Sequence, residues 1–327
     1  AKCMSVLGRK RTFLLFISLG MGACLLAAQS LELQSFKLFC ASTFLLGISS
    51  AALQQIRFAA MESVNTEQGT TAVSIIMCAG IVAAFLGPEL AVLGRTITET
   101  EYRGSFWLAA GCLLVGAVLL ALFYQAAPQR TSSEDSKPRP MIQILSSPTL
   151  ILAIASGAAA YMVMSLVMTA TPISMHLHHG YSIEDTKWVI QSHVAAMFLP
   201  SLATIWLFRL LTIQGLMAAG LACFTITIVI GLIDVTVLGY WGQMVMLGIG
   251  WNFLFVSGTA LLPTTHQPGE HFRAQAVNDS IIFSTQAIAA LSAGWAISII
   301  SWQSLLLLCL IPMAIISTLL IWQRKAF

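Results

Sequence analysis

Long apolar runs separated by short polar stretches fill this chain from one end to the other. A helix rises about 1.5 Å per residue, so roughly 20 apolar residues cross the ~30 Å hydrocarbon core of a membrane. Ten runs reach this length, and most of them contain no charged residue. The pattern predicts ten membrane-spanning helices, at residues 12–31, 36–60, 70–93, 104–124, 148–175, 188–208, 213–233, 240–262, 280–300 and 302–322.

Strands do not explain these runs, because a transmembrane strand needs only about 9–11 residues and alternates apolar with polar positions. The composition agrees with helices in lipid: 57% of the residues are hydrophobic, 9% are charged, and the mean hydropathy is +0.85. Soluble domains carry about 25% charged residues. A soluble enzyme, a secreted disulfide scaffold, a disordered chain and a nucleic-acid binder are therefore excluded. We predict an all-α polytopic protein whose surroundings are the lipid bilayer.

The distribution of Lys and Arg predicts how the helices are oriented. Twelve of the sixteen basic residues fall on one side of the predicted spans, and four fall on the other: Lys37, Arg95, Arg103 and Lys187. Loops on the cytoplasmic side carry the excess of positive charge. Ten crossings then place both ends of this chain in the cytoplasm. We expect the protein to lie in a bacterial inner membrane.

Residues 125–147 form the longest polar stretch, rich in Pro, Ser and charge, and they divide the predicted spans into four and six. We expect an incomplete N-terminal bundle at 1–124, a cytoplasmic linker at 125–147 and a six-helix bundle at 148–327. A shift of 204 residues brings the region from Ala72 onto the region from Ala276, with a few identities. Duplicated halves are common in secondary transporters. The 4 + 6 division, with Ala as first residue, predicts a twelve-helix protein without its first two helices.

Two motifs resemble those of the major facilitator superfamily. Residues 1–10, AKCMSVLGRK, lie in register with its loop motif G-x-x-x-D-R/K-x-G-R-R/K, where Gly8, Arg9 and Lys10 match. Ser5 stands in the Asp position. The charge pair that links this loop to neighbouring helices in the family therefore lacks its usual acid. Residues 83–92 resemble the pattern G-x-x-x-G-P-x-x-G-G of the fifth family helix through Gly87 and Pro88.

Several further strings resemble a bacterial subgroup of this family that includes a riboflavin importer: residues 55–64, 164–175, 190–201, 250–262 and 274–283. The resemblance implies two helical bundles around a central cavity and transport by alternating access. It also implies that the second predicted span lines the cavity.

That second span carries a polar stripe. Ser50, Gln54 and Arg57 continue a spacing that begins at Thr43 and Gly47, so all five share one helix face. Polar groups facing lipid are costly, so the stripe faces either the cavity or a neighbouring helix. Arg57 can also snorkel to the cytoplasmic interface. Facing the cavity, it would suit an anionic or carbonyl-rich solute.

The later spans add further cavity candidates. Tyr161 and Ser165 share a face of the fifth span, and Trp251 and Asn252 stand halfway along the eighth. A mid-membrane amide needs a partner, which is either a solute or a second helix. Aromatic rings here either stack on a flat solute or pack the interior.

Glu89 is the one acid within a predicted span and is therefore a candidate for proton coupling. It stands roughly 28 Å along its helix, at ~1.5 Å per residue, which favours an interfacial or gating role shared with Gly87 and Pro88. His193 is expected near the outer end of its span. Asn278 and Asp279 are expected to cap the start of theirs, because short polar side chains and negative charge favour helix N-termini.

No P-loop, G-x-S-x-G or H-E-x-x-H motif occurs in the chain. We therefore predict no enzyme, no cofactor and no metal site. The predicted function is secondary transport of a small organic solute with a coupling proton or ion, and the resemblance implies uptake of riboflavin or a related nutrient. The alternatives are an efflux antiporter for drugs or metabolites and a membrane sensor that transports nothing.

Overall fold

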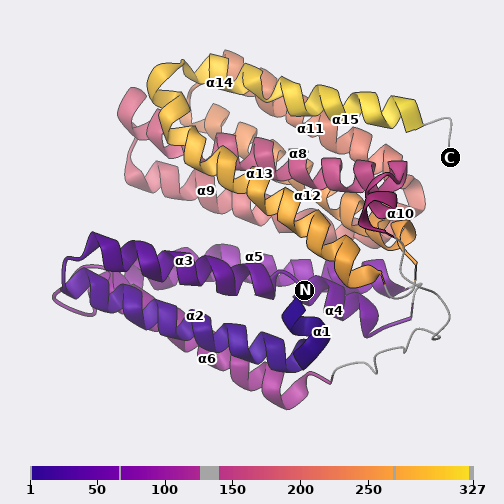
Figure 1. The fold of residues 1–327 in the computed structure, drawn as a ribbon. Coiled ribbons are helices and arrows are strands. Elements are labelled where there is room, and N and C mark those ends of the chain that lie inside the picture. Colours follow the sequence, from indigo (N-terminus) through magenta and orange to yellow (C-terminus); the bar gives the residue numbers. More distant parts are fainter. Residues whose placement is uncertain (1, 66–67, 126–139, 268–269, 324–327) are drawn as a thin grey trace. The chain divides into compact units, whose positions relative to one another are not determined.

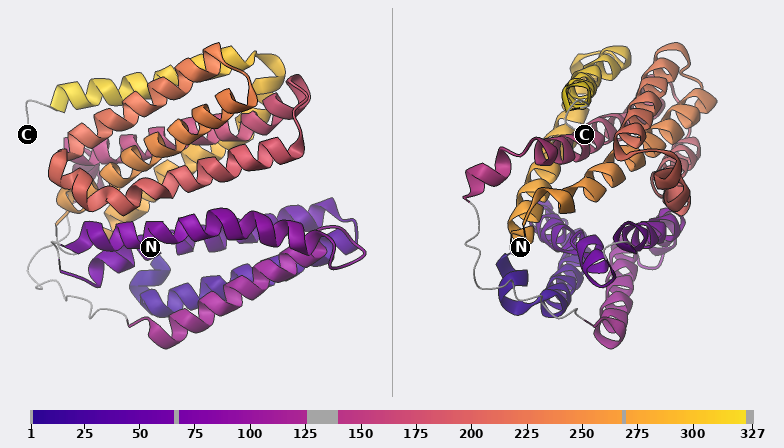
Figure 2. Two further views of the ribbon diagram at one scale, coloured as in Figure 1. Left: turned by 180° about the vertical axis from the view of Figure 1, so that it is seen from behind. Right: turned by 90° about the vertical axis from the view of Figure 1, so that its right-hand side faces the viewer.

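The computed structural model describes residues 2–65, 68–125, 140–267 and 270–323 (Figure 1). The chain divides into two compact units, an N-terminal unit (Ala1–Arg130) and a C-terminal unit (Thr131–Phe327). In each unit the long helices run side by side (Figure 2). The described part of the chain contains helices and no strand, as the apolar runs predict.

The N-terminal unit is built on α2, which packs between α3 and α6, while α5 packs on α4 and α6. Ser49 of α3 donates a hydrogen bond to the carbonyl oxygen of Phe16 in α2, at 2.7 Å. Gly20 of α2 lies directly against Ser49, so the small side chains bring these two helices close together. The helices are α1 (Lys2–Leu7), α2 (Arg9–Glu32), α3 (Phe36–Leu53), α4 (Ile56–Glu62), α5 (Gly69–Arg95) and α6 (Arg103–Phe123).

The C-terminal unit has α8 and α12 at its centre. α12 packs on α8, α9 and α11, and α8 packs in addition on α13 and α15. The helices are α7 (Met141–Leu145), α8 (Pro148–Ile173), α9 (Ile183–Phe198), α10 (Thr204–Leu210), α11 (Ile213–Ile233), α12 (Val237–Leu261), α13 (His271–Ile299), α14 (Trp302–Leu308) and α15 (Leu310–Gln323). Three short segments extend or join them: a π-helix, η2 (Ser174–His178), and two 3-10 helices, η3 (Leu199–Ala203) and η4 (Leu262–Thr265).

Helix starts in this protein are marked by hydroxyl side chains. Ser182 forms a capping box with Asp185 at the start of α9. Thr212 accepts from Gly215 N at the start of α11, and Thr236 accepts from Gly239 N at the start of α12, both at 3.1 Å. These caps satisfy amide groups that have no partner within the helix.

Nine helical stretches among the described residues are long and apolar enough to cross a membrane. The sixth predicted span, 188–208, is not a continuous helix, because α9 ends at Phe198 and passes through η3 into α10. Pro200 has no amide hydrogen to continue the helical ladder, which accounts for the break. The second predicted span is also interrupted, at Gln54 and Gln55 between α3 and α4.

The predicted cap at Asn278 and Asp279 is wrong. α13 begins at His271, and both residues are buried more than a turn inside it. Hydropathy missed this start because the first two turns of the helix are polar.

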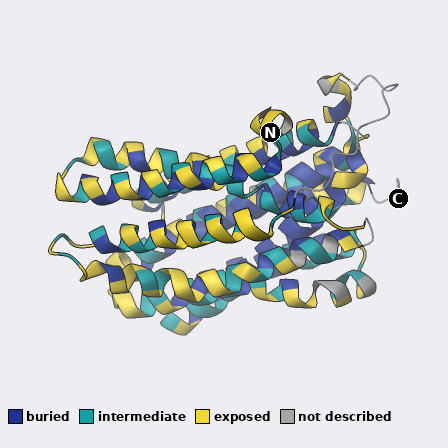
Figure 3. Ribbon diagram, turned by 90° about the horizontal axis from the view of Figure 1, so that it is seen from below, coloured by how far each residue is buried: buried dark blue, intermediate teal, exposed yellow. Residues whose placement is uncertain are grey.

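Exposed residues run along the outer faces of the helices, yellow in Figure 3. Many of them are large and apolar, such as Leu291 and Trp295 of α13, which are 83% and 68% exposed. Apolar surface of this extent is expected where a protein meets lipid. The protein is therefore a multi-pass membrane protein.

Candidate functional site

An aromatic cluster lies inside the C-terminal unit. Tyr161 of α8 presents its ring edge-on to Trp251 and Phe255 of α12, at centroid distances of 5.3 Å each. Phe283 of α13 meets Tyr161 at 5.5 Å, and Phe198 of α9 meets Trp251 at 5.9 Å. Trp251 and Phe255 are one turn apart and stack at 4.9 Å. Four helices thus contribute rings to one cluster, which we call the aromatic cluster.

Trp251 brings an unused hydrogen-bond donor to this cluster. Its ring is 2% exposed, and its Nε1–H has no hydrogen-bond partner among the described residues. A buried donor without a partner costs about 1–3 kcal/mol, so proteins retain few of them. An aromatic surface beside a free N–H is suited to a planar solute with a carbonyl oxygen.

Asn252, the neighbour of Trp251, forms hydrogen bonds to residues on both sides of the break that follows α9. Its Nδ2 donates to the carbonyl oxygen of Met197 at 2.7 Å and to Ser201 Oγ at 2.8 Å. An uninterrupted helix would pair the Met197 carbonyl with the amide of Ser201. The interhelical hydrogen bond, one of the two roles predicted for Asn252, is present here, and its contact with a solute stays a prediction.

The seam between α9 and α12 continues toward the start of α9. His193 is fully buried, its Nδ1 hydrogen-bonds the Met244 carbonyl at 2.8 Å, and its Nε2 has no partner among the described residues. It stands ten residues after Ile183, about 15 Å into α9 at ~1.5 Å per residue. The expected position near the outer end is thus wrong, because α9 begins five residues before the predicted span.

Ser165, predicted with Tyr161, is buried one turn further along α8 and lies 3.9 Å from the sulfur of Met164. Ser156 was not predicted. Its hydroxyl donates to the Leu254 carbonyl of α12 at 2.7 Å, so it joins the two central helices. Sequence gives no sign of which serine performs this packing.

In the N-terminal unit the predicted polar stripe faces away from the α2–α3 contact. Ser50 is exposed and Gln54 is half-buried, whereas the buried serines of α3 are Ser42 and Ser49. Arg57 lies in α4, is 2% exposed, and places its guanidinium over the ring of Phe58 at 4.5 Å. The stripe is therefore available for a role other than packing on α2.

Gly87, Pro88 and Glu89 lie within α5, which stays helical through the proline. Gly87 and Glu89 are exposed and Pro88 is half-buried. Their role in gating or coupling stays a prediction.

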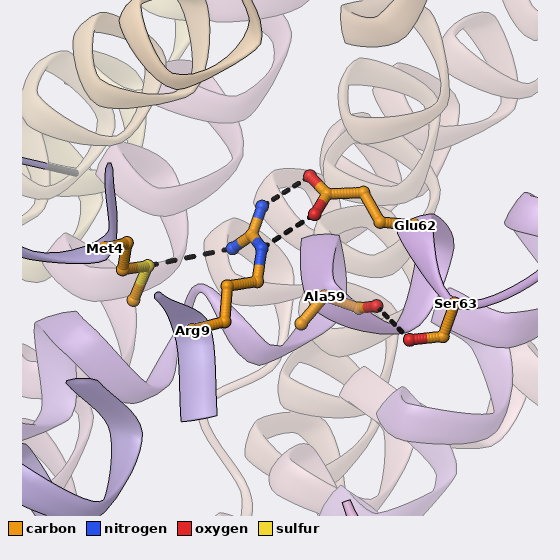
Figure 4. Close-up of polar contacts among 5 residues, drawn as sticks. All are labelled: Met4, Arg9, Ala59, Glu62 and Ser63. Carbon is orange, nitrogen blue, oxygen red and sulfur yellow. Dashed lines mark hydrogen bonds and ion pairs between the residues drawn. The ribbon is translucent and has the colours of Figure 1, made fainter. Parts of the chain in front are cut away.

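The loop motif forms the junction between α1 and α2. Gly8 adopts φ +76°, a conformation that favours glycine, and the chain turns there into α2, with Lys10 half-buried in its first turn. Arg9 is buried and donates two hydrogen bonds to Glu62 at the end of α4, from Nε to Oε2 at 2.7 Å and from Nη2 to Oε1 (Figure 4). Its Nη1 donates to Met4 Sδ at 3.7 Å. The loop thus has an acid partner in Glu62, which the motif with Ser5 did not reveal.

A family model described as Major Facilitator Superfamily matches residues 3–278. The chain belongs to this superfamily of transporters. The riboflavin transporter RfnT of Brucella anthropi is 35% identical over 307 residues, which cover 92% of this chain and 76% of the relative. Two uncharacterized transporters of the superfamily from Bacillus subtilis, YddS and YdeG, are each 28% identical and cover 92% and 93% of this chain and 74% of each relative.

The fold of the superfamily also matches. The crystal structure of the Escherichia coli fucose:proton symporter FucP superimposes with a TM-score of 0.72 at 14% identity, covering 98% of this chain and 85% of FucP. FucP in an outward conformation gives a TM-score of 0.69. Among the described residues of the transporter, no group of three or more His, Cys, Asp or Glu side chains is placed to hold a metal ion.

Loss of the Glu62 carboxylate is expected to destabilise the N-terminal unit. Glu62→Gln removes the carboxylate that pairs with the buried Arg9 guanidinium and should lower the free energy of unfolding by about 1–2 kcal/mol. This value is smaller than that for a fully buried pair, because Glu62 is 38% exposed. Thermal unfolding of the transporter in detergent measures this. Glu101→Gln is the control, since the Arg95–Glu101 pair is 49% and 65% exposed and should contribute much less to stability than the Arg9–Glu62 pair. Equal effects of the two variants would contradict a structural role for Arg9–Glu62.

Proposed function

We propose that this transporter moves a small, planar organic solute of the riboflavin class across the bacterial inner membrane by alternating access, with import as the direction. The observation that carries the proposal is the aromatic cluster with the unused Trp251 donor. A flavin ring is flat, aromatic and edged with carbonyl oxygens, so it can use both features. The 35% identity to a riboflavin transporter supports the same solute class.

Each element of the cluster has a defined part in this proposal. The rings of Tyr161, Trp251 and Phe255 supply offset and edge-on contacts, each contributing about 0.5–1.5 kcal/mol beyond burial. Trp251 Nε1–H donates to a solute carbonyl and so fixes the orientation of the ring. Binding requires the cluster to open, because these three side chains are at most 5% exposed.

The N-terminal unit carries solute-contact candidates of its own. We assign Ser50, Gln54 and Arg57 to the solute path, since the first two do not serve the α2–α3 contact and the third is a buried cation. A guanidinium binds carbonyl-rich or anionic groups by paired hydrogen bonds. A flavin that carries a hydroxylated side chain offers such acceptors.

Both ends of the chain are assigned to the cytoplasm on the positive-inside rule.

The decisive experiment is flux of labelled riboflavin in vesicles that contain the purified full-length transporter. The proposal is supported if these vesicles take up more label than empty vesicles do, and if unlabelled riboflavin suppresses that uptake. Flux only from the cytoplasmic side outward would instead identify an efflux antiporter. Correctly inserted protein with no flux of riboflavin would refute the proposed solute. In cells, rescue of a riboflavin auxotroph at limiting riboflavin is the corresponding assay.

A further inference from the structure

His193 of α9 carries a hydrogen-bond acceptor that the described part of the chain leaves unused. The side chain is 0% exposed, and its Nδ1 lies 2.8 Å from the Met244 carbonyl oxygen of α12. A carbonyl oxygen can only accept a hydrogen bond, so Nδ1 carries the proton. In the neutral ring the second nitrogen, Nε2, is then an acceptor, and it has no partner among the described residues. Native structures retain few buried polar atoms without a partner, and each requires an explanation.

The His193 side chain belongs to the same α9–α12 seam as the aromatic cluster. Met244 and Trp251 are seven residues apart on α12, about two helical turns, and therefore share a face of that helix. On α9, Phe198 follows His193 by five residues, about 7.5 Å at ~1.5 Å per residue, and its ring contacts Trp251. The residues that carry the free acceptor and the free donor are thus close neighbours along one seam.

A second buried side chain shows why the seam matters. Gln243 is also 0% exposed, and its amide has no hydrogen-bond partner among the described residues. Its Nε2 is the atom that a Cβ on Gly231 of α11 would meet first, so the amide faces α11 and not α9. His193 and Trp251, in contrast, both make their contacts across the seam between α9 and α12.

We propose that His193 Nε2 is a specificity determinant that accepts a hydrogen bond from an N–H or O–H group of the solute, an inference that rests on the proposed function. Together with Trp251 it selects a planar solute that presents a carbonyl oxygen to the indole and a hydrogen-bond donor to the imidazole. Riboflavin has two kinds of donor, the imide N–H of its ring and the hydroxyl groups of its side chain. A solute without a donor leaves Nε2 unpaired and is rejected, because an unpaired polar atom in a closed site is costly.

Two amide variants separate contact with the solute from a role in packing. The Nδ2 of Asn is bonded to Cγ, as Nδ1 of His is, so His193→Asn can keep the hydrogen bond to Met244 and loses the acceptor. The Oε1 of Gln is two bonds from Cγ, as Nε2 of His is, so His193→Gln can keep the acceptor and loses the Nδ1–H. His193→Asn should raise the KM for riboflavin uptake roughly tenfold, and His193→Gln should stay within about threefold of wild type. His178→Asn, at an exposed residue of η2, is the matched control and should leave KM unchanged.

Riboflavin analogues identify which donor His193 binds. N3-methylriboflavin lacks the ring N–H, and lumiflavin lacks the hydroxylated side chain. Inhibition of labelled riboflavin uptake into proteoliposomes gives the affinity of each analogue relative to riboflavin. In wild type, the analogue without the recognised donor should bind roughly tenfold more weakly than riboflavin. In His193→Asn this difference should largely disappear, because the acceptor is gone, and the relative affinity of the other analogue should not change.

The outcomes distinguish this proposal from the proposed function. Absence of riboflavin flux in wild-type vesicles refutes the proposed function. Riboflavin transport with the same relative analogue affinities in wild type and folded His193→Asn overturns the role of His193 and leaves transport intact. A raised KM in His193→Gln together with a wild-type KM in His193→Asn also overturns it, because the hydrogen bond to Met244 would then be the one that matters. Loss of folded protein in both variants would likewise assign His193 to the packing of α9 on α12.

Discussion

Gly248→Leu is expected to prevent the C-terminal unit from folding. A Cβ at Gly248 of α12 would lie 2.7 Å from the His193 carbonyl oxygen and 2.9 Å from the Met197 amide nitrogen. Both are backbone atoms of α9, so no side chain can move aside, and the helices themselves must separate. Overpacking a tight core costs about 1–3 kcal/mol, and a leucine against backbone should exceed that range. The expected result is aggregated protein on size-exclusion chromatography in detergent.

A pair of alanine variants isolates the cause. Gly242 is on the same helix, and its Cβ would meet only the Ile230 side chain, at 3.8 Å. Alanine is favoured over glycine in a helix by about 1 kcal/mol at either position. Gly242→Ala should therefore match or exceed wild-type thermal stability, and Gly248→Ala should fall below it. If both variants are stabilised equally, the close approach of α9 and α12 does not limit the fold.

Trp251→Phe is expected to reduce riboflavin affinity roughly tenfold, with a raised KM and little change in the amount of folded protein. The substitution keeps a ring beside Tyr161 and Phe255 but removes the Nε1–H that has no partner among the described residues. One hydrogen bond to a solute carbonyl is worth about 0.5–1.5 kcal/mol, and its upper end corresponds to a tenfold change. Trp251→Ala also removes the ring, so its loss should be larger. Initial rates of uptake at increasing riboflavin concentration measure both.

Trp295→Phe provides the matched control. Trp295 lies on α13 and is 68% exposed, so the same chemical change there should leave KM unchanged. If Trp251→Phe also leaves KM unchanged and instead stabilises the protein, then the indole N–H is a structural defect and not a ligand for the solute. Such a result would remove the main support for a flavin site in the aromatic cluster.

The sequence by itself determined the membrane-spanning character and most of the helix positions. The run 213–233 is found as α11 (Ile213–Ile233), because uninterrupted apolar residues report directly the free energy of transfer into lipid. Tyr161, Trp251 and Asn252 could be selected because polar and aromatic groups in mid-span need a reason to be there.

Only the tertiary structure decided which groups meet. Arg9 and Glu62 are 53 residues apart, and periodicity cannot show that α4 ends beside the start of α2. On α3, the helical repeat defines the faces of Ser49 and Ser50 equally well, and packing on α2 buries the first. Asp279 was predicted at the start of its helix and not within it, because hydropathy measures each residue against lipid. Inside a bundle, a helix can begin with polar turns and bury them against its neighbours, since hydrogen bonds such as that from Asn278 to Asp279 replace those to water.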